Sequence, residues 1–224
     1  MIWRSIPYEM SSPAWNMACD EAIFLNYIQG KAPPTIRFYG WNPPTLSIGF
    51  FQDVEREVDL KAIQQKGLGL VRRNTGGRAV LHHYELTYSV VAGSNIGLPN
   101  SLIESYLYIS RAFVAACEYF GIKADLHRGT AGKVTNTAAC FETPSWYELT
   151  VGHRKLVGSA QLRQHGFFLQ HGSILLDFNA AELAAVLMAP VSKPVFATQL
   201  EAKITSFRKL GLEVEPRKLG QVIV

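Results

Sequence analysis

A cysteine and a lysine in the second half of the chain could do chemistry together. Cys140 follows the small and polar run Asn136–Ala139, and Lys155 comes shortly after it. A thiolate can take an acyl group as a thioester, while a nearby ammonium lowers the pKa of a thiol and polarises the incoming carbonyl group. The pair therefore indicates acyl transfer, with both residues as catalytic candidates. The alternatives are a buried, inert cysteine and a lysine that merely ends a strand.

A glycine-rich run is the second feature that could bind a substrate. Residues 72–82 read RRNTGGRAVLH. Paired glycines between two strands let the backbone approach a ligand closely, and the arginines add positive charge beside it. The run lacks the GxxxxGK and GxGxxG spacings of nucleotide-binding loops. By itself it fits a substrate-binding loop and an ordinary glycine turn with exposed arginines equally well.

The composition predicts a globular protein with a buried core. Of the 224 residues, 48% are hydrophobic and 18% are charged, which argues against a disordered or fibrous chain. We expect a single catalytic domain over residues 1–224. The 22 basic and 18 acidic side chains leave a formal charge of +4, which favours acidic partners. Because no long run of lysine and arginine is present, we expect an acidic carrier protein rather than a nucleic acid.

The cysteines and the termini bear on the compartment. Cys19, Cys117 and Cys140 form no CxxC pair, and their odd number leaves a free thiol in any arrangement. This predicts a reduced, cytoplasmic protein. The N-terminus lacks a charged leader before an apolar stretch, and no apolar run approaches the ~20 residues that span a bilayer. We expect no membrane insertion, no cofactor and no metal, since the histidines show no zinc-like spacing.

Start and stop signals divide the chain into helices and strands. Ser12 before Pro13 predicts the start of an amphipathic helix through Tyr27. Residues 35–39 and 45–51 predict two strands that form a hairpin around the turn at residues 41–44. The other elements expected before residue 125 are a short helix over 59–66, strands over 69–73 and 86–91, and a long helix over 101–120.

The second half predicts a loop followed by a meander. Residues 125–139 are polar and without periodicity, which indicates a loop that delivers Cys140 at its end. Residues 146–151, 155–163 and 167–176 then predict three antiparallel strands, with Gly152 and Gly166 at the turns. Helices are expected over 180–188 and from near residue 215. Since the last helix runs to Val224, either a truncated C-terminus or a short family member fits.

Several segments together resemble a known family. The run at 72–82, followed by ELTYS at 85–89, is similar to the signature of the biotin/lipoate protein ligase and lipoyl-transferase superfamily. Four further segments resemble those of the cysteine-dependent octanoyltransferases of lipoate biosynthesis. These are IRFYGWNP at 36–43, CF at 140–141 with PSWYEL at 144–149, GSAQ at 158–161 and QHGSILLD at 170–177. The resemblance covers residues from about Trp3 to Asp177.

The resemblance implies an α+β fold with a mixed, largely antiparallel sheet flanked by helices. It also implies an apolar acyl tunnel beside the glycine loop, for which Leu70, Val71, Val80, Leu81 and Tyr88 are candidate lining residues. At ~0.8 kcal/mol per buried CH₂, a dry tunnel could contribute roughly 5 kcal/mol to recognition of an octanoyl chain. Cys140 matches the nucleophile and Lys155 matches the lysine that contacts the acyl carbonyl. The expected substrate-binding residues are Arg73, Thr75, Gly76, Gly77, Arg78, His82, Gly158 and Ser159.

The chain departs from the family pattern directly after His82. The aspartate that usually follows is replaced by His83. Any role that needs a carboxylate there, such as orienting His82 or contacting the carrier, is therefore in doubt. Four other residues in the matching segments have no distinct chemical role: Asn16, Asp20, Arg37 and Asn42. For His171, Gly172 and Ser173, packing or hydrogen bonding is the expected function.

The resemblance implies a ping-pong reaction without ATP, because a thioester is already activated relative to an amide. The Cys140 thiolate takes the octanoyl group from octanoyl-acyl carrier protein. A lysine of the glycine cleavage system H protein, or of another lipoyl domain, then accepts it. We expect a monomer. Three alternatives stay open: an ATP-dependent lipoate ligase that uses Lys155 without Cys140, an amidotransferase between lipoyl domains, and an inactive acyl-carrier-binding protein.

Overall fold

The fold is built on two sheets. The structure, a computed structural model, describes residues 2–128 and 147–224. In this part of the chain a seven-stranded sheet has the order β1-β2-β6-β10-β9-β8-β7, and a three-stranded sheet has the order β4-β3-β5. The larger sheet comprises β1 (Arg4–Ser11), β2 (Thr35–Trp41), β6 (Glu85–Gly93), β7 (Asp125–Arg128), β8 (Tyr147–Val151), β9 (Arg154–Gln164) and β10 (Phe167–Leu175). The smaller one comprises β3 (Thr45–Ile48), β4 (Gly69–Arg72) and β5 (Val80–His82).

Most strand pairs are antiparallel. In the larger sheet β1 runs parallel to β2, and the other neighbours are antiparallel. In the smaller sheet β3 is parallel to β4 and antiparallel to β5. With helices on both faces of the larger sheet, this arrangement confirms the predicted α+β fold with a mixed, largely antiparallel sheet. The second, three-stranded sheet was not predicted.

The helices begin where the capping signals place them. Ser12 accepts a hydrogen bond from the backbone N–H of Trp15 at the start of α1, and Ser101 accepts one from Glu104 at the start of α4. Pro13 and Pro216 occupy first-turn positions. The helices are α1 (Pro13–Ile28), α2 (Val54–Glu57), α3 (Leu60–Gln65), α4 (Leu102–Tyr119), α5 (Ala180–Val186), α6 (Lys193–Lys203) and α7 (Pro216–Ile223).

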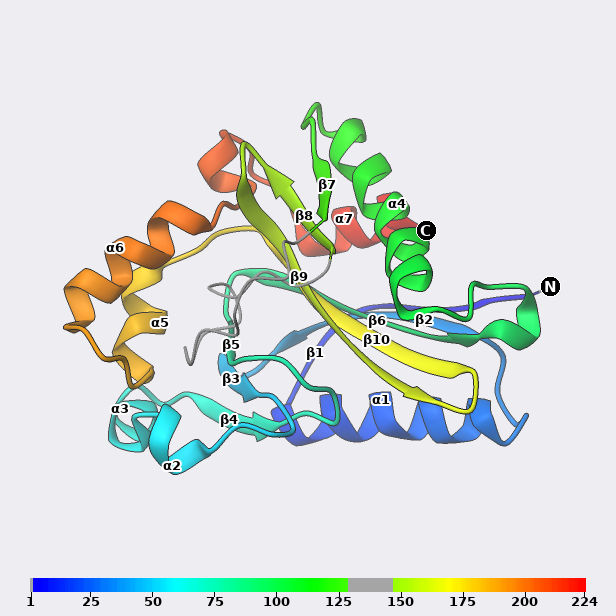
Figure 1. Cartoon of the computed structure of the whole chain (residues 1–224), viewed down its shortest axis with the longest axis horizontal. Helices are drawn as coiled ribbons and strands as arrows, with labels where there is room; N and C mark the ends of the chain where they lie inside the picture. The colour runs from blue at the N-terminus through cyan, green and yellow to red at the C-terminus, as the bar shows by residue number, and fades with distance from the viewer. Residues whose placement is uncertain (1, 129–146) are drawn as a thin grey trace.

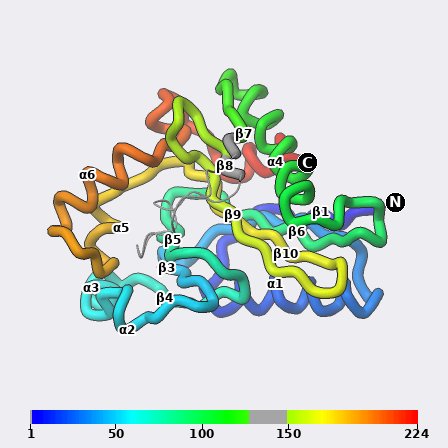
Figure 2. The backbone as a smooth tube through the Cα atoms, in the orientation of Figure 1, coloured from blue at the N-terminus to red at the C-terminus, as the bar shows by residue number. Residues whose placement is uncertain are grey.

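Three layers result from the way the helices pack (Figure 1; Figure 2). α4 and α7 cover one face of the larger sheet, where Phe113 packs with Tyr88 in the largest apolar cluster. α1 lies on the opposite face, where Phe24 contacts a cluster with Val91. α3, α5 and α6 pack around the smaller sheet with a core of their own. α1 contacts both sheets, through β2, β6 and β10 of the larger one and β4 of the smaller one.

Two expectations about local structure are wrong. β2 and β3 do not form a hairpin, because β2 pairs with β1 and β6 while β3 pairs with β4 and β5. Pro43 and Pro44 lack N–H donors, so the chain leaves one ladder there and enters the other sheet. Residues 125–128 form strand β7 rather than a loop. Their pairing with β8 determines this structure, not a pattern of their own.

The meander is confirmed. β8, β9 and β10 are successive antiparallel neighbours, and Gly152 and Gly166 take positive φ angles of 56° and 84° at the two turns. The remainder of the expected loop, together with Cys140, lies outside the described residues.

Candidate functional site

A narrow cavity lies between the two sheets and has a volume of ≈ 30 Å³. The larger sheet supplies one wall and the smaller sheet the other, with Met17 of α1 at the side. The wall on the larger sheet consists of Tyr39, Trp41, Thr87, Gly158, Ser159, Ala160, His171, Gly172 and Ser173. The facing wall consists of Ser47, Arg73, Val80 and His82. Of the five apolar residues expected to line a tunnel, Val80 is in the wall and Val71 is not among the wall residues. Leu70 and Leu81 pack against the core of the smaller sheet, and Tyr88 lies under α4.

Arg73 shapes the glycine loop at residues 74–77. Arg73 is 4% exposed. Nη1 donates to the carbonyl and the hydroxyl of Ser47, and Nη2 donates to the carbonyls of Gly76 and Arg78 at 3.0 and 2.7 Å. A planar fork that holds several carbonyls fixes the path of a loop that has no regular structure of its own.

The loop is also packed closely against its neighbours. The Phe50 N–H donates to the Thr75 carbonyl at 2.9 Å. A Cβ atom on Gly49 would collide with the Gly77 carbonyl, so a glycine is needed there for close approach. Gly77 takes a φ of +91°, which favours glycine for its own reason. Gly49 is required by close packing and Gly77 by its backbone conformation, and both requirements support a shaped loop over a loose turn.

His82 lies inside the cavity wall and has several partners. Its Nε2 lies 2.7 Å from the Ser47 hydroxyl, and its Nδ1 lies 3.4 Å from both Glu85 Oε1 and Thr87 Oγ1. Its ring stacks on Trp41 with centroids 4.3 Å apart. These contacts come from both sheets, so His82 bridges them.

The carboxylate beside His82 comes from Glu85, not from the next residue in the chain. Glu85 is buried, and its Oε1 accepts a hydrogen bond from Thr87 at 2.5 Å. His83 points elsewhere: its Nδ1 lies 2.9 Å from Glu182 of α5, and its ring stacks on Tyr84. The replacement of the usual aspartate by His83 therefore does not remove the carboxylate near His82.

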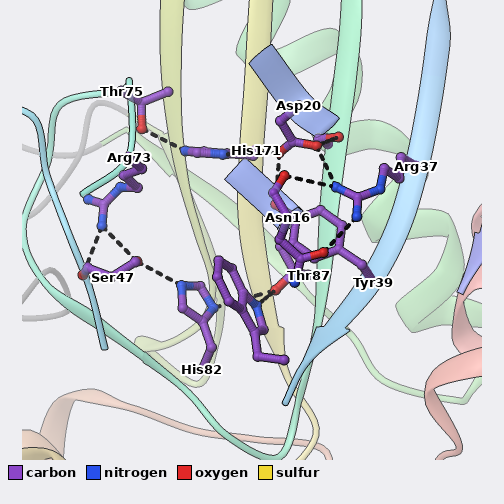
Figure 3. A network of polar contacts seen from close by, with 12 residues as sticks. Asn16, Asp20, Arg37, Tyr39, Ser47, Arg73, Thr75, His82, Thr87 and His171 are labelled. Carbon is purple, nitrogen blue, oxygen red and sulfur yellow. Dashed lines mark hydrogen bonds and ion pairs between the residues drawn. The ribbon is translucent and has the colours of Figure 1, made fainter. Parts of the chain in front are cut away.

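A buried polar network stands behind the opposite wall (Figure 3). Asp20 of α1 accepts hydrogen bonds from Arg37 at 2.9 Å, from the Tyr39 hydroxyl at 2.8 Å and from the Ser89 hydroxyl at 2.8 Å. Its Oδ2 also lies 3.5 Å from His171 Nδ1. His171 Nε2 in turn lies 2.6 Å from the Thr75 hydroxyl. The network thus joins α1, the larger sheet and the glycine loop.

Burial and the neighbouring polar groups shift the pKa values of this network in opposite directions. Burial raises the pKa of Asp20, but the hydrogen bond and charge of His171, the charge of Arg37 and the Tyr39 hydroxyl outweigh it, so the pKa is lowered overall. Burial lowers the pKa of His171, and the contact with Asp20 only partly opposes this. An ionised Asp20 beside a neutral His171 follows at neutral pH.

Ser159 lies on the wall but bonds towards the opposite face of the sheet. Its hydroxyl is 2.6 Å from the Tyr88 hydroxyl, which accepts a hydrogen bond from Gln170 at 2.8 Å. Burial raises the pKa of Tyr88 to about 12, so the phenol stays protonated and its hydrogen is available to Ser159. A Cβ atom on Gly172 would meet the Gly158 carbonyl, which explains the glycine at that position.

The predicted site residues do not all meet in this cavity. Arg73, His82, Gly158 and Ser159 line it, and Thr75 to Gly77 form the adjoining loop. Arg78 instead pairs with Glu57 of the neighbouring α2 at 3.2 Å. Lys155 on β9 is 3% exposed, and its carbonyl accepts the Thr205 N–H. Because Cys140 is outside the described residues, its pairing with Lys155 stays a prediction.

Of the two cysteines in the described residues, Cys117 is in a core that disfavours its thiolate. Cys117 packs in the core beneath α4, where burial raises the pKa of its thiol to about 12. Cys19 is half-buried on α1. Within residues 2–128 and 147–224, no group of three or more metal-ligating side chains could hold a metal ion. No helix in the described ranges is long and apolar enough to cross a membrane.

Sequence reasoning missed the importance of the Asp20 network. Asn16 and Asp20 are both buried and lie one helical turn apart, so two polar side chains occupy the inner face of an otherwise amphipathic helix. That i, i+4 spacing was the available signal. Their partner Arg37, which donates to both, comes from a strand whose pairing the local sequence does not specify.

Comparison with known families decides what this architecture is. The model of the lipoyl protein ligase A/B catalytic domain matches residues 12–223. The chain belongs to this family. Among solved members, lipoate-protein ligase A bound with ATP superposes with a TM-score of 0.79 at 25% identity, covering 100% of this chain and 83% of that one. A bipartite lipoate protein ligase from Thermoplasma acidophilum gives 0.75 at 25% identity, covering 100% and 81%.

Curated members of the family place the chain more closely. Octanoyltransferase LipM of Moorella thermoacetica is 52% identical over 191 residues, covering 84% of this chain and 70% of that protein. Octanoyltransferase LipM of Bacillus subtilis is 45% identical over 195 residues, with the same coverage. These relatives confirm the predicted resemblance to octanoyltransferases and the predicted enzyme class, an acyltransferase.

Proposed function

We propose that this protein transfers an octanoyl group from acyl carrier protein to a lysine of a lipoyl-accepting domain, with a thioester on Cys140 as the intermediate. The observation that carries the proposal is the identity of 45–52% to octanoyltransferases over 84% of the chain. A cavity between the two sheets, bordered by the glycine loop, supports it. The acceptor would be the glycine cleavage system H protein or another lipoyl domain.

The chemistry of the cavity walls suits an aliphatic chain. Most polar atoms of the walls are hydrogen-bonded to one another. Arg73 and His82 form hydrogen bonds with the Ser47 hydroxyl, and Thr87 accepts a hydrogen bond from Trp41 at 2.7 Å. Carbon atoms then remain to contact a ligand. A cavity of ≈ 30 Å³ has room for only a few waters, each of which needs ~10–15 Å³, so an octanoyl chain must displace side chains to enter. Met17 is suited to move, since methionine is flexible and adapts its packing.

Two steps complete the proposed transfer. The Cys140 thiolate attacks the carbonyl of the carrier thioester, and the pantetheine thiol leaves as the tetrahedral intermediate collapses. The neutral amine of the acceptor lysine then attacks the enzyme thioester, releases the Cys140 thiolate and forms an amide after loss of its proton. Lys155, nearly excluded from solvent, would stabilise the oxyanion of both intermediates, a contribution that can reach several kcal/mol in a water-excluded site.

The other proposed roles follow from position. Gly76, Gly77 and Thr75 would place the loop backbone beside the substrate, and His82, Gly158 and Ser159 would contact the acyl chain. Arg73 would act mainly by holding the loop, since it donates hydrogen bonds to the carbonyls of Ser47, Gly76 and Arg78. Arg78 is a weaker candidate because it faces Glu57. We propose that these parts belong to one catalytic domain, a monomer in the cytoplasm.

The test is transfer in the absence of ATP. Wild-type protein mixed with octanoyl-acyl carrier protein and an apo lipoyl domain should octanoylate the domain, while Cys140→Ser should not. Lys155→Ala should lower the turnover rate strongly and change the unfolding temperature only slightly. Cys19→Ser, at a half-buried position on α1, is the matched control and should transfer at the wild-type rate. Transfer by Cys140→Ser at that rate would refute the thioester mechanism.

A second candidate is ATP-dependent ligation, which one observation favours. The structure closely matches a lipoate-protein ligase A bound with ATP. In that case free octanoate or lipoate and ATP would modify the lipoyl domain, and Cys140→Ser would remain active. Adding ATP with the free acid, in place of the acyl carrier, separates the two functions in the same assay.

A further inference from the structure

A short hydrogen bond ties the glycine loop to the larger sheet. The Thr75 hydroxyl lies 2.6 Å from Nε2 of His171 on β10, although the two residues are far apart in the chain. Hydrogen bonds from Phe50 and Arg73, which belong to segments that flank the smaller sheet, hold the loop from the other side. Because the cavity lies between the sheets, the bond from Thr75 to His171 sets how the loop sits above it.

The second ring nitrogen of His171 determines the direction of that bond. Nδ1 faces Asp20 Oδ2 at 3.5 Å. Asp20 also accepts hydrogen bonds from Arg37, Tyr39 and Ser89, as Figure 3 shows for the labelled residues, so every contact it makes comes from a donor. An ionised carboxylate favours a proton on Nδ1. Nε2 then carries the lone pair and accepts the hydrogen of the Thr75 hydroxyl.

Burial keeps the ring of His171 neutral against the opposing effect of Asp20. The groups that act on it are Asp20, Arg73 and His82, and burial is the largest cause of its lowered pKa. The charge of Asp20 is already matched by Arg37, with 2.9 Å between them. A second positive charge on His171 is therefore not required to neutralise the carboxylate.

This set of residues has the outline of a hydroxyl–histidine–carboxylate triad, but it lacks the features of a nucleophile. Thr75 is 1% exposed and is not among the residues of the cavity wall. Arg37 neutralises the carboxylate of Asp20, so this carboxylate offers little stabilisation to an imidazolium. The geometry fits a hydroxyl that is held in place, not one that attacks an acyl group.

We infer that Asp20, His171 and Thr75 form a positioning relay, in which Asp20 orients His171 and His171 fixes the glycine loop for acyl transfer. The inference rests on the proposed function for its catalytic consequence. Gly76 and Gly77 directly follow Thr75 in the chain, so a loop released from His171 would shift the backbone beside the acyl carbonyl. A displacement of about 1 Å can cost on the order of 10²-fold in rate.

The matched pair Thr75→Val and Thr75→Ser tests the relay. Valine keeps the shape and removes the hydroxyl, whereas serine keeps the hydroxyl. We expect Thr75→Val to lower kcat at least tenfold with little change in KM, and Thr75→Ser to retain most of the rate. His171→Leu should resemble Thr75→Val, and the double variant should be no slower than either single one, because both remove the same bond. Thermal unfolding of each variant shows whether it is folded.

The tautomer of His171 provides a readout that does not depend on activity. Nitrogen NMR of the wild-type protein should show a proton on Nδ1 and none on Nε2, and Thr75→Ser should keep this state. A proton on Nε2 would overturn the relay even if octanoyl transfer is observed. Equal kcat values for folded Thr75→Val and Thr75→Ser would overturn it too. A wild-type protein that fails to transfer octanoyl, yet shows the Nδ1 proton, would instead refute the proposed function alone.

Discussion

Two histidines bridge the cavity from opposite sheets, and their surroundings differ. His171 on the larger sheet makes a 2.6 Å contact with Thr75, and its partner Asp20 is balanced by Arg37. His82 on the smaller sheet lies 3.4 Å from Glu85, and within the described residues the second carboxylate oxygen of Glu85 has no hydrogen-bond partner. The bridge through His171 is therefore short, and its carboxylate is balanced by an arginine. The bridge through His82 is longer, and its carboxylate has an oxygen without a hydrogen-bond partner in the described part of the chain.

The difference indicates which wall yields when an acyl chain enters. A buried network whose members are all satisfied resists change, because any movement leaves a polar group or a charge without a partner. Movement of the bridge through His82 would break fewer hydrogen bonds between satisfied groups. Its ring stacks on Trp41 of the larger sheet, a contact that can slide without leaving a polar group unpaired, and its contact with Ser47 lies within the smaller sheet and can shift with it. We therefore expect the wall with His171 to act as the fixed reference and the wall with His82 to adapt.

Isosteric amide substitutions should separate the two bridges most clearly. Asp20→Asn leaves Arg37 buried without its counter-charge, and loss of one partner of a buried ion pair costs about 3–5 kcal/mol. Glu85→Gln creates no such orphaned cation and should cost about 1 kcal/mol, the net value of an ordinary hydrogen bond. Urea denaturation of both variants measures the free energy of unfolding. Equal losses would mean that the two bridges are not different in kind.

Acid should weaken the His171 side selectively. The pKa of His171 is lowered from its ordinary 6.5 in the folded protein, so the unfolded chain binds the proton first as the pH falls. Stability is therefore fully present above pH 6.5 and declines towards the lower folded pKa, by at most about 1.4 kcal/mol per pH unit for one proton. His171→Gln should flatten this part of the profile. Denaturation across this range measures the slope, and an unchanged slope would contradict the assignment.

Restoring the aspartate after His82 should have the smallest effect. His83→Asp would place a carboxylate beside Glu182, at a site where both side chains are partly exposed, and should cost about 0–1 kcal/mol. It should not raise the transfer rate, because Glu85 already supplies the carboxylate near His82. Steady-state rates and urea denaturation check both statements. A clear gain in rate would show that the position next to His82 takes part in the reaction.

Local signals accounted for much of the fold. Ser12 and Ser101 mark helix starts, and Gly152 and Gly166 mark turns, because each depends on chemistry within a few residues. The assignment of β2 and β3 to different sheets depends on distant partners, and no local pattern encodes it. The edge strand β7 is polar and takes its structure from β8. For the same reason the three-stranded sheet was not predicted.

The glycine loop of the site was predictable from the sequence, but the buried polar network that holds it was not. The run from Arg73 to His82 indicated a substrate loop, and the structure places much of it beside the cavity. Asp20, Arg37 and His171 come from three elements that meet only after folding. Their mutual contacts could not be derived from spacing. The roles of Cys140 and Lys155 came from reactivity and family resemblance, and they remain proposals.

The central claim is that Cys140 carries the acyl group, and intact-protein mass spectrometry tests it most directly. The protein would be mixed with octanoyl-acyl carrier protein without ATP, beside Cys140→Ser and Cys19→Ser. We predict a mass increase of one octanoyl group on the wild type and on Cys19→Ser, removable by neutral hydroxylamine and missing from Cys140→Ser. A folded wild-type protein that gains no octanoyl group, or a Cys140→Ser variant that gains one, would contradict the account.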